Sequence, residues 1–103
     1  MPMDSSIFLI KKTYKEDALG QRITDKEIRT EIFVRIDSVG RTEFYKAGQS
    51  GLSPEYVFIT PVINYSGERE IEYDGTRYDI YRTYSPSDSD EIELYVHKKV
   101  STR

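Results

Sequence analysis

The stretch IEYDGTRYDI, residues 71–80, carries the clearest structural signal in the sequence. Its centre, Asp74-Gly75, supplies the positive φ angles that a two-residue type I′ turn requires, so the stretch predicts a β-hairpin. Such a turn fixes the register, and with it the side chains that face the core. The predicted opposite pairs are Tyr73 with Thr76, Glu72 with Arg77, and Ile71 with Tyr78, with Glu72 and Arg77 able to form an ion pair on the outer face.

Four further segments have the alternating or β-branched composition of strands. They are residues 7–14, 30–39, 55–62 and 91–100, and residues 18–21 read as a loop between the first two. The segment 55–62 carries apolar residues on both faces, so we expect it to be the most buried strand. The residues expected to share one core are Ile32, Val34, Ile36, Ile71, Tyr78, Ile80, Leu94 and Val96.

Only Arg41–Gln49 breaks this β pattern. Phe44 and Ala47 lie three residues apart, as on one helical face, and Gly48 can act as the C-cap. We therefore predict a helix of one to two turns. The Gly- and Ser-rich segment that follows, Gln49–Pro54, is expected to form a flexible loop.

Length and composition favour one small domain. The 103 residues can form a single modest core, 37% of them are hydrophobic, and nine Tyr and four Phe supply bulky side chains. We predict an all-β fold over residues 1–103, a small antiparallel β-barrel or sandwich of about six strands with one short helix. There is no cysteine, so the core must hold by packing alone. The apolar run Ile7–Ile10 is too short for a signal peptide or a membrane span, which favours the cytoplasm.

The charge pattern argues against a nucleic-acid-binding protein. Fifteen basic and eighteen acidic residues are interspersed and give a net charge of -3. Binding to nucleic acid depends on clustered cations, and the sequence has no such cluster. The segment 48–51 has the spacing of an RNA-binding GxxG loop, but Lys46 is the only cation near it.

No residue pattern points to an enzyme, a cofactor or a metal site. His97 is the only histidine, and no cysteine or strained serine accompanies it, so we expect an exposed surface residue. Asp88 and Asp90 could begin a calcium loop, but the positions of its glycine and its bidentate glutamate hold Glu93 and Lys99.

Tyrosines are too numerous for all of them to be buried in so small a core. An outward tyrosine is a rigid amphipathic anchor of the kind found at protein interfaces, and it can equally cover the end of a barrel. The sequence leaves both alternatives open for Tyr45, Tyr56, Tyr65, Tyr81, Tyr84 and Tyr95.

From about Lys11 to Lys99 the sequence resembles the small head-closure, or head-tail joining, proteins of tailed bacteriophages. Members of that family have a strand that ends near a Ser, then a Glu-Phe-x-x-Ala helix, a Gly-Leu-x-x-Glu turn and a Tyr-x-Gly-x-x-Tyr-x-Ile-x-Arg hairpin. The matching residues here are Ser38, Glu43, Phe44, Ala47, Gly51, Leu52, Glu55, Tyr73, Gly75, Tyr78, Ile80 and Arg82. Many relatives carry a Trp before the helix, where this chain has Phe33.

The resemblance implies a structural virion protein. Head-closure proteins form a ring, commonly a dodecamer, below the portal and adaptor rings. That ring closes the DNA exit channel and offers a surface to the tail-completion protein. DNA passes through the ring without specific binding. The implied location is the head–tail interface of the virion, or the bacterial cytoplasm during assembly or in a prophage host. The residues expected at the subunit interface or in the channel loop are Glu43, Tyr45, Lys46, Gln49, Ser50, Gly51, Leu52 and Ser53, with Asp74 and Gly75 as the turn.

The alternative is a small ligand-binding β-barrel of the oligonucleotide- or oligosaccharide-binding type. Such a module uses exposed aromatic side chains to stack on bases or sugars, but it commonly also has a basic groove, which this sequence lacks. Binding to single-stranded DNA that weakens with salt would favour this alternative. Ring formation only with a partner ring would favour the connector.

Overall fold

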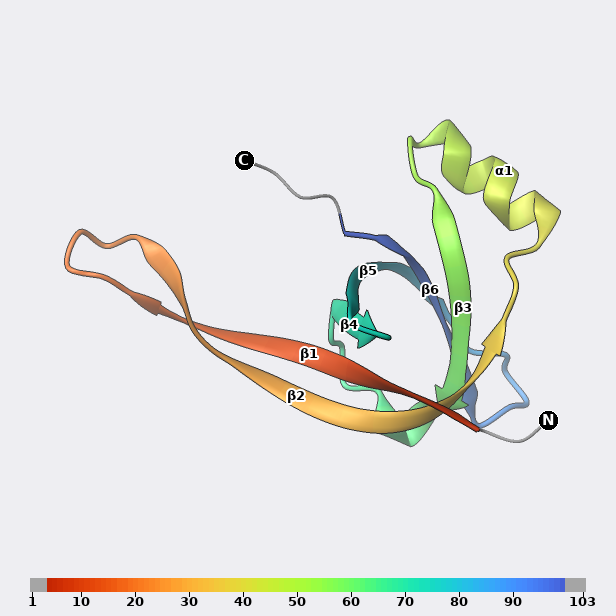
Figure 1. Ribbon diagram of the computed structural model, residues 1–103, viewed down its shortest axis with the longest axis horizontal. Helices are drawn as coiled ribbons and strands as arrows, with labels where there is room; N and C mark the ends of the chain where they lie inside the picture. Colours follow the sequence, from red (N-terminus) through yellow and green to blue (C-terminus); the bar gives the residue numbers. More distant parts are fainter. Residues whose placement is uncertain (1–3, 100–103) are drawn as a thin grey trace.

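The computed structural model describes residues 4–99 and places most of them in β-strands (Figure 1). The predicted class, mostly β with one short helix, is confirmed. In chain order the elements are β1 (Ser5–Glu16), β2 (Arg22–Asp37), α1 (Arg41–Gln49), β3 (Pro54–Pro61), the 3-10 turn η1 (Val62–Asn64), β4 (Glu70–Tyr73), β5 (Thr76–Tyr84) and β6 (Glu91–Lys98). The last predicted strand extended to Val100, which lies outside the described residues.

The strands close into a single antiparallel barrel, so the structure selects the barrel over the sandwich. Their order around it is β1-β2-β3-β6-β5-β4. The ladder between β3 and β6 runs from Pro54 opposite His97 to Pro61 opposite Glu91. Two seams are much shorter: β2 meets β3 only over Arg35–Asp37, and β1 meets β4 only over Phe8–Ile10.

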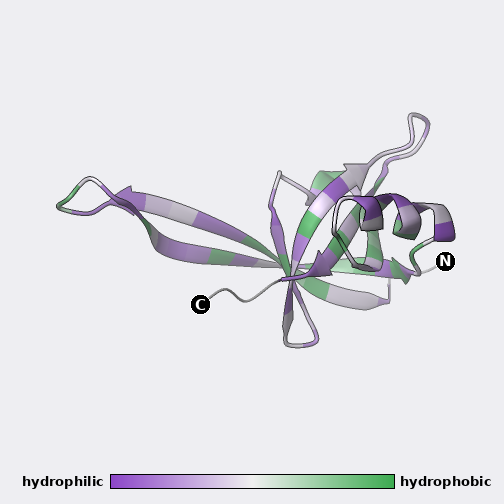
Figure 2. Cartoon of the chain, turned by 90° about the horizontal axis from the view of Figure 1, so that it is seen from above, coloured by the Kyte–Doolittle hydropathy of each residue, from purple (hydrophilic) through white to green (hydrophobic). Residues whose placement is uncertain are grey.

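The core fills the inside of this barrel, and the apolar colouring in Figure 2 is concentrated there. Every residue of the predicted core either belongs to the buried cluster or packs against it, as Ile36 and Ile80 do. The prediction omitted Ile7, Leu9 and Phe58, which are fully buried. β3 buries four consecutive residues, from Val57 to Thr60, in agreement with the expectation that this strand is covered on both faces.

The hairpin formed by β4 and β5 has the predicted turn and register. Asp74 has φ 52° and Gly75 has φ 79°, as a type I′ turn requires. The three predicted pairs face one another, and Arg77 Nε donates to Glu72 Oε1 over 3.1 Å. Turn chemistry alone therefore determines which residues of this hairpin face the core.

We expect Gly75→Val to destabilise the protein by more than about 1 kcal/mol, because a β-branched residue tolerates a positive φ poorly. A Cβ added at Gly75 would meet no atom within 4 Å, so the penalty comes from the backbone and not from a clash. Urea unfolding would measure the change. Gly75→Asn is the matched control, since asparagine visits this conformation readily and should lose much less. Equal stability of the Val variant and the wild type would contradict the turn assignment.

Helix α1 has the predicted bounds, but two details of its prediction are wrong. The C-cap is Ser50, not Gly48, and Gly51 follows it with φ 80°. The N–H groups of Gly51 and Leu52 donate to the carbonyls of Gly48 and Ala47, each over 3.0 Å, which is the hydrogen-bond pattern of a Schellman motif. Of the two glycines, Gly51 is therefore the one that follows the helix end with a positive φ, and Gly48 lies within the helix.

The second wrong detail concerns the face of α1 that is buried. Ala47 is buried as expected, whereas Phe44 is 54% exposed, so the two do not share one buried face. With only nine residues, α1 covers the barrel through a small side chain. Its large aromatic side chain remains on the surface.

β1 and β2 are much longer than predicted and project from the barrel as a two-stranded ribbon (Figure 1). We call the projecting part, residues 13–26, the arm. Its tip is a turn in which Asp17 Oδ1 accepts from the backbone N–H groups of Leu19 and Gln21. The predicted strand 30–39 missed the first eight residues of β2 and extended two residues beyond its end at Asp37.

The arm was not predicted from the sequence, because it buries very little side-chain surface. Residues 22–31 are all exposed, so no alternation of apolar and polar side chains marks them as a strand. A bulge between Thr13 and Tyr14 shifts the register as well. Figure 2 shows the arm as mainly hydrophilic, in contrast to the barrel.

Candidate interaction surface

Helix α1 is held against β5 by one carboxylate. The hydroxyl of Tyr81 donates to Glu43 Oε2 over 2.7 Å, and Arg82 Nη2 donates to Glu43 Oε1, also over 2.7 Å. Glu43 lies in the first turn of α1, so these contacts fix the beginning of the helix. The side chain that anchors the helix was among the predicted interface residues, but its two partners were not.

The environment of Glu43 keeps it ionised. The hydrogen bond from Arg82 lowers the pKa of Glu43 and, with the bond from Tyr81, outweighs the opposing effect of burial. The pKa of Tyr81 is raised, first by burial and then by its hydrogen bond to Glu43. The anchor is therefore a charge-assisted contact across the neutral pH range.

A hollow of about 390 Å³ lies between α1, the segment after it and β5. It is lined by Glu43, Lys46, Ala47, Ser50, Leu52, Tyr81 and Arg82. Of the predicted interface residues, Glu43, Lys46, Ser50 and Leu52 are thus brought together. Gln49, Gly51 and Ser53 are exposed beside the hollow, and Tyr45 is 68% exposed.

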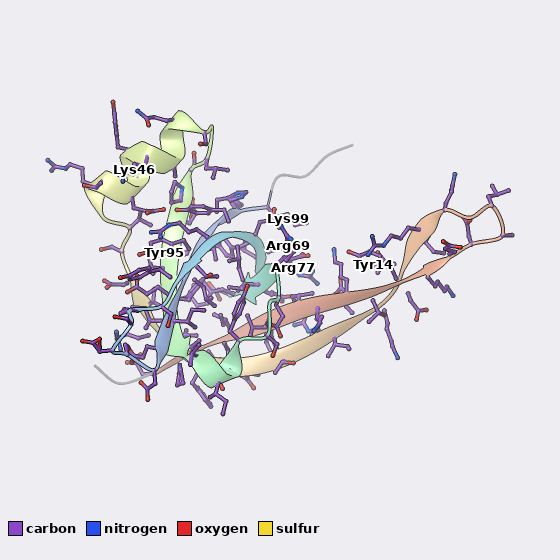
Figure 3. The ribbon with its side chains drawn as sticks, turned by 180° about the vertical axis from the view of Figure 1, so that it is seen from behind. Tyr14, Lys46, Arg69, Arg77, Tyr95 and Lys99 are labelled. Carbon is purple, nitrogen blue, oxygen red and sulfur yellow. The ribbon has the colours of Figure 1, made fainter. Side chains whose placement is uncertain are left out.

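Aromatic side chains continue this surface from β5 onto β6. The Tyr81 ring lies 5.8 Å from His97 and 6.4 Å from Tyr95, and Arg82 Cζ lies 4.1 Å from the Tyr95 ring centre. Burial and a hydrogen bond to Glu93 raise the pKa of Tyr95 to about 12. His97 is partly buried against Tyr81, whereas an exposed surface residue was expected. Figure 3 shows Tyr95 on this side of the barrel, with Lys46 on α1 nearby.

The six tyrosines differ in their exposure. Tyr45 and Tyr84 are exposed, and Tyr56 and Tyr65 pack against the core. Tyr81 and Tyr95 are partly buried, between these extremes. Tyr45 and Tyr84 are therefore the ones most accessible to a partner.

The predicted turn residues Asp74 and Gly75 lie in a different place. They line a hollow of about 440 Å³ together with Ser6, Phe8, Glu72 and Tyr73. None of these residues belongs to the hollow beside α1. The predicted site residues therefore occupy two separate surfaces.

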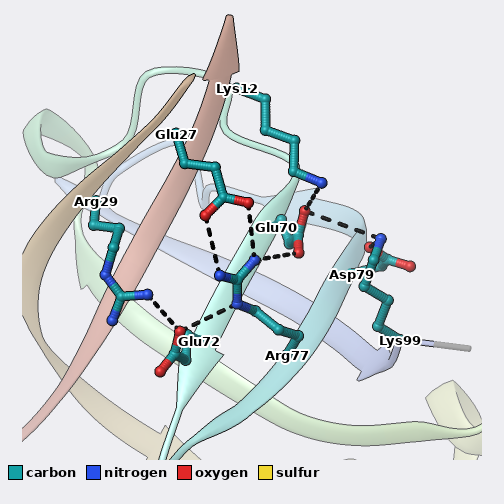
Figure 4. A network of polar contacts seen from close by, with 8 residues as sticks. All are labelled: Lys12, Glu27, Arg29, Glu70, Glu72, Arg77, Asp79 and Lys99. Carbon is teal, nitrogen blue, oxygen red and sulfur yellow. Dashed lines mark hydrogen bonds and ion pairs between the residues drawn. The ribbon is translucent and has the colours of Figure 1, made fainter. Parts of the chain in front are cut away.

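The sequence did not reveal a network of ion pairs at the base of the arm (Figure 4). Its centre is Arg77 on β5, which contacts Glu27 at 3.1 Å, Glu70 at 2.9 Å and Glu72 at 3.1 Å. Glu27 belongs to β2, and the other two carboxylates belong to β4. One guanidinium group thus joins three strands.

Further pairs extend the network on both sides of Arg77. Arg29 contacts Glu72 at 2.6 Å, Lys12 contacts Glu70 at 3.1 Å, and Lys99 contacts Asp79 at 3.4 Å. The network therefore ties the base of the arm on β1 and β2 to β4 and β5 of the barrel. Only the Glu72–Arg77 pair followed from the predicted hairpin register, because the other partners come from strands distant in the sequence.

Two carboxylates of the network, those of Glu70 and Glu72, have a lowered pKa. Burial alone would raise the pKa of Glu70, but hydrogen bonds from Arg77 and Lys12 outweigh it and lower this pKa. A hydrogen bond from Arg29 lowers the pKa of Glu72. The pKa of Arg77 is raised, first by Glu27 and then by Glu70.

Residues 4–99 contain no group of three or more His, Asp or Glu side chains placed to hold a metal ion. Over the same residues, no helix has the length and apolar character needed to cross a membrane.

No protein-family model matches the sequence, and no curated protein is similar enough to it to count as a match.

Proposed function

We propose that this protein is a structural subunit of a bacteriophage head–tail connector. In this role it forms a ring below the portal–adaptor connector protein, closes the DNA exit channel and provides a surface for tail attachment. The observation that carries the proposal is the pair of projections on one closed barrel. The arm extends along the longest axis of the molecule, which measures 49 Å, and α1 lies near β3, away from the arm (Figure 1).

The positions of the phage resemblance support this proposal by their arrangement. Glu43 and Arg82 are both among the resembling residues, are 39 residues apart in sequence, and meet over 2.7 Å. Tyr78 and Ile80 from the same pattern face the core, and Gly75 forms the turn. These residues therefore serve one arrangement, a barrel with α1 anchored to β5.

Helix α1 and the segment after it have the properties of a docking element. Phe44 and Tyr45 present exposed aromatic surface, which is enriched at protein interfaces. The backbone hydrogen bonds of Ser50, Gly51 and Leu52 tie this segment to the helix end. Any movement on assembly would therefore displace α1 and this segment together, about the Glu43 anchor.

The favourable free energy of such an assembly would come from many identical contacts between subunits. Identical modest contacts around a ring reinforce one another, because each neighbour raises the effective concentration of the next. A chain with a net charge of -3 and interspersed charges also suits a channel wall, since weak phosphate binding lets DNA pass.

The test is docking onto purified portal–adaptor connector rings, followed by sedimentation and native mass spectrometry. We expect the wild type to dock as a ring and the double variant Phe44→Ser, Tyr45→Ser to bind at least about tenfold more weakly, as loss of interface aromatics commonly causes. Tyr84→Ser is the matched control, because Tyr84 is half exposed but lies outside α1. It should dock like the wild type.

Amide exchange of residues 41–53 adds a second readout, since these amides should become more protected on docking. Absence of docking, or equal docking by both variants, would contradict the proposal. Binding of single-stranded DNA that weakens with salt would instead support the ligand-binding barrel.

A further inference from the structure

The arm has open hydrogen-bonding edges on both sides. β1 pairs with β4 only over Phe8–Ile10, and β2 pairs with β3 only over Arg35–Asp37. Beyond these seams, within residues 4–99, Lys11–Glu16 have strand partners only in β2, and Arg22–Val34 have strand partners only in β1. Each of these stretches therefore presents outward-pointing N–H and C=O groups at alternate residues.

A two-stranded ribbon of this kind is incomplete as a structural unit. An isolated hairpin is marginally stable in water, and additional strands or a packed face are needed to stabilise it. Tyr14 and Ile23 on the arm and Ile28 at its base are each partly exposed, and Leu19 at the arm tip is 82% exposed. Neighbouring strands would satisfy the open backbone groups and cover part of this apolar surface.

We propose that the arm is completed by the arm of a second copy of this chain, with β2 of one copy adding to β1 of the next. β1 runs toward the arm tip and β2 runs back from it. If copies are related by rotation about an axis along their arms, β2 of each faces β1 of its neighbour, and the two strands are antiparallel. The same contact repeats at every subunit, as closure of a ring requires.

This inference rests on the ring arrangement of the proposed function and specifies how its subunits join. The arm is well suited to its own copy as a partner, because the two open edges come from one hairpin, and Lys11–Glu16 of one copy can lie along part of the longer open edge of the next. Residues 11–16 carry three Lys and one Glu, a net charge of +2. The facing stretch, residues 22–31, carries three basic and three acidic residues and is neutral, so the lysine-rich edge of one copy meets no edge of like net charge in the next.

The ion-pair network prepares the arm for this role. Lys12, Glu27 and Arg29 at the arm base are each bound to β4 or β5, which sets the direction of the arm relative to the barrel. Every copy therefore presents its arm at the same angle before assembly. Such pre-organisation reduces the entropy lost when identical subunits associate.

The test is amide exchange on a covalent tandem of two full chains joined by a flexible Gly/Ser linker of about 30 residues. The linker raises the effective concentration of one arm near the other to about the millimolar range. The tandem forms one such joint, so residues 11–16 of one copy and residues 22–30 of the other gain a partner. Each of these segments should therefore show two populations, and in one of them alternate amides should exchange at least about tenfold more slowly than in the single chain in dilute solution. An alternating pattern is specific to strand addition, because only the outward-pointing amides gain partners.

A shortened variant is the control. Lys12 and Glu27 face each other in the ladder, so residues 13–26 can be replaced by Asn-Gly without removing the network. Its tandem should keep the barrel fold but lose the protection at residues 11, 12 and 27–30. Arm amides that exchange equally fast in the full-length tandem and in the single chain would overturn the inference.

Single cysteines then identify the strands that meet, since the chain has none of its own. Mixed Lys15→Cys and Lys26→Cys chains, linked by a short bis-maleimide, should yield predominantly mixed dimers. A predominance of like dimers would overturn the β2-to-β1 arrangement. Loss of arm protection with intact connector docking would reject this inference alone, whereas failed docking with arm protection intact would reject the proposed function alone.

Discussion

Truncation of Phe58 to alanine is expected to lower the free energy of unfolding by about 3–5 kcal/mol, the usual cost of removing a buried phenylalanine. Phe58 is 0% exposed, and its ring centre lies 5.4 Å from that of Tyr73 and 5.6 Å from that of Tyr56. Small domains have a total stability of about 5–15 kcal/mol, so this variant should be close to unfolding. Urea denaturation would measure the loss.

The control for this prediction is Phe33→Ala, which removes the same group from a position that is 63% exposed. Its effect should stay within about 0.5 kcal/mol, as for most surface substitutions. Similar losses for both variants would mean that the barrel interior is not the main source of stability.

The second large effect is expected for Arg77→Met, which should destabilise the protein by about 2–3 kcal/mol. Removing one member of a buried ion pair leaves the other charge without compensation, and partial exposure moderates this cost. The Arg77 side chain is 32% exposed, but that of Glu70 is only 9% exposed. Glu27→Gln is the control, because it removes a more exposed partner and should cost less than about 1 kcal/mol.

Acid should reduce this difference between the wild type and Arg77→Met. The folded state lowers the pKa values of Glu70 and Glu72 below the ordinary 4.5. Their contribution to stability is therefore fully present above pH 4.5 and is lost as pH falls through the lower folded values. Denaturation series from pH 7 downward should show the wild type losing more stability than the variant. Parallel curves would contradict the network as the cause.

Sequence reasoning succeeded where the decisive interactions are local. The Asp74-Gly75 turn fixed three cross-strand pairs, because a two-residue turn leaves only one register. The alternation of residues 92, 94 and 96 identified the buried face of β6 in the same way. In both places burial and strand period agree, so the hydrophobic pattern could be read directly.

It failed where structure does not depend on burial. The arm is held by backbone ladder bonds between exposed strands, and no residue pattern marks such a ribbon. At the end of α1, two glycines compete as the cap, and only the backbone conformation distinguishes Gly51 from Gly48. Phe44 and Ala47 were placed on one helical face from their spacing, but a helix of nine residues offers few contacts to cover Phe44.

Only one side of the candidate surface, the side formed by α1 and the segment after it, was predicted from the sequence. The resemblance pointed to Glu43 and to the segment after α1, both of which lie at the hollow beside β5. Its other wall, Tyr81 with Arg82, comes from a strand whose position relative to the helix depends on barrel closure. The same limit applies to Arg77, for which the hairpin register predicted Glu72 as a partner but neither Glu27 nor Glu70.

The two short seams of the barrel imply an uneven resistance to opening. The backbone ladders that join the ribbon of β1 and β2 to the other four strands cover only residues 8–10 on one side and residues 35–37 on the other. Strands β3, β6, β5 and β4 form a sheet whose ladders do not depend on those seams. Within the ribbon, the arm contributes no buried side chain to the core, so it is the part expected to open at the lowest free energy, before the barrel unfolds. Mechanically, the molecule is expected to combine a barrel that stays closed with an arm that opens first.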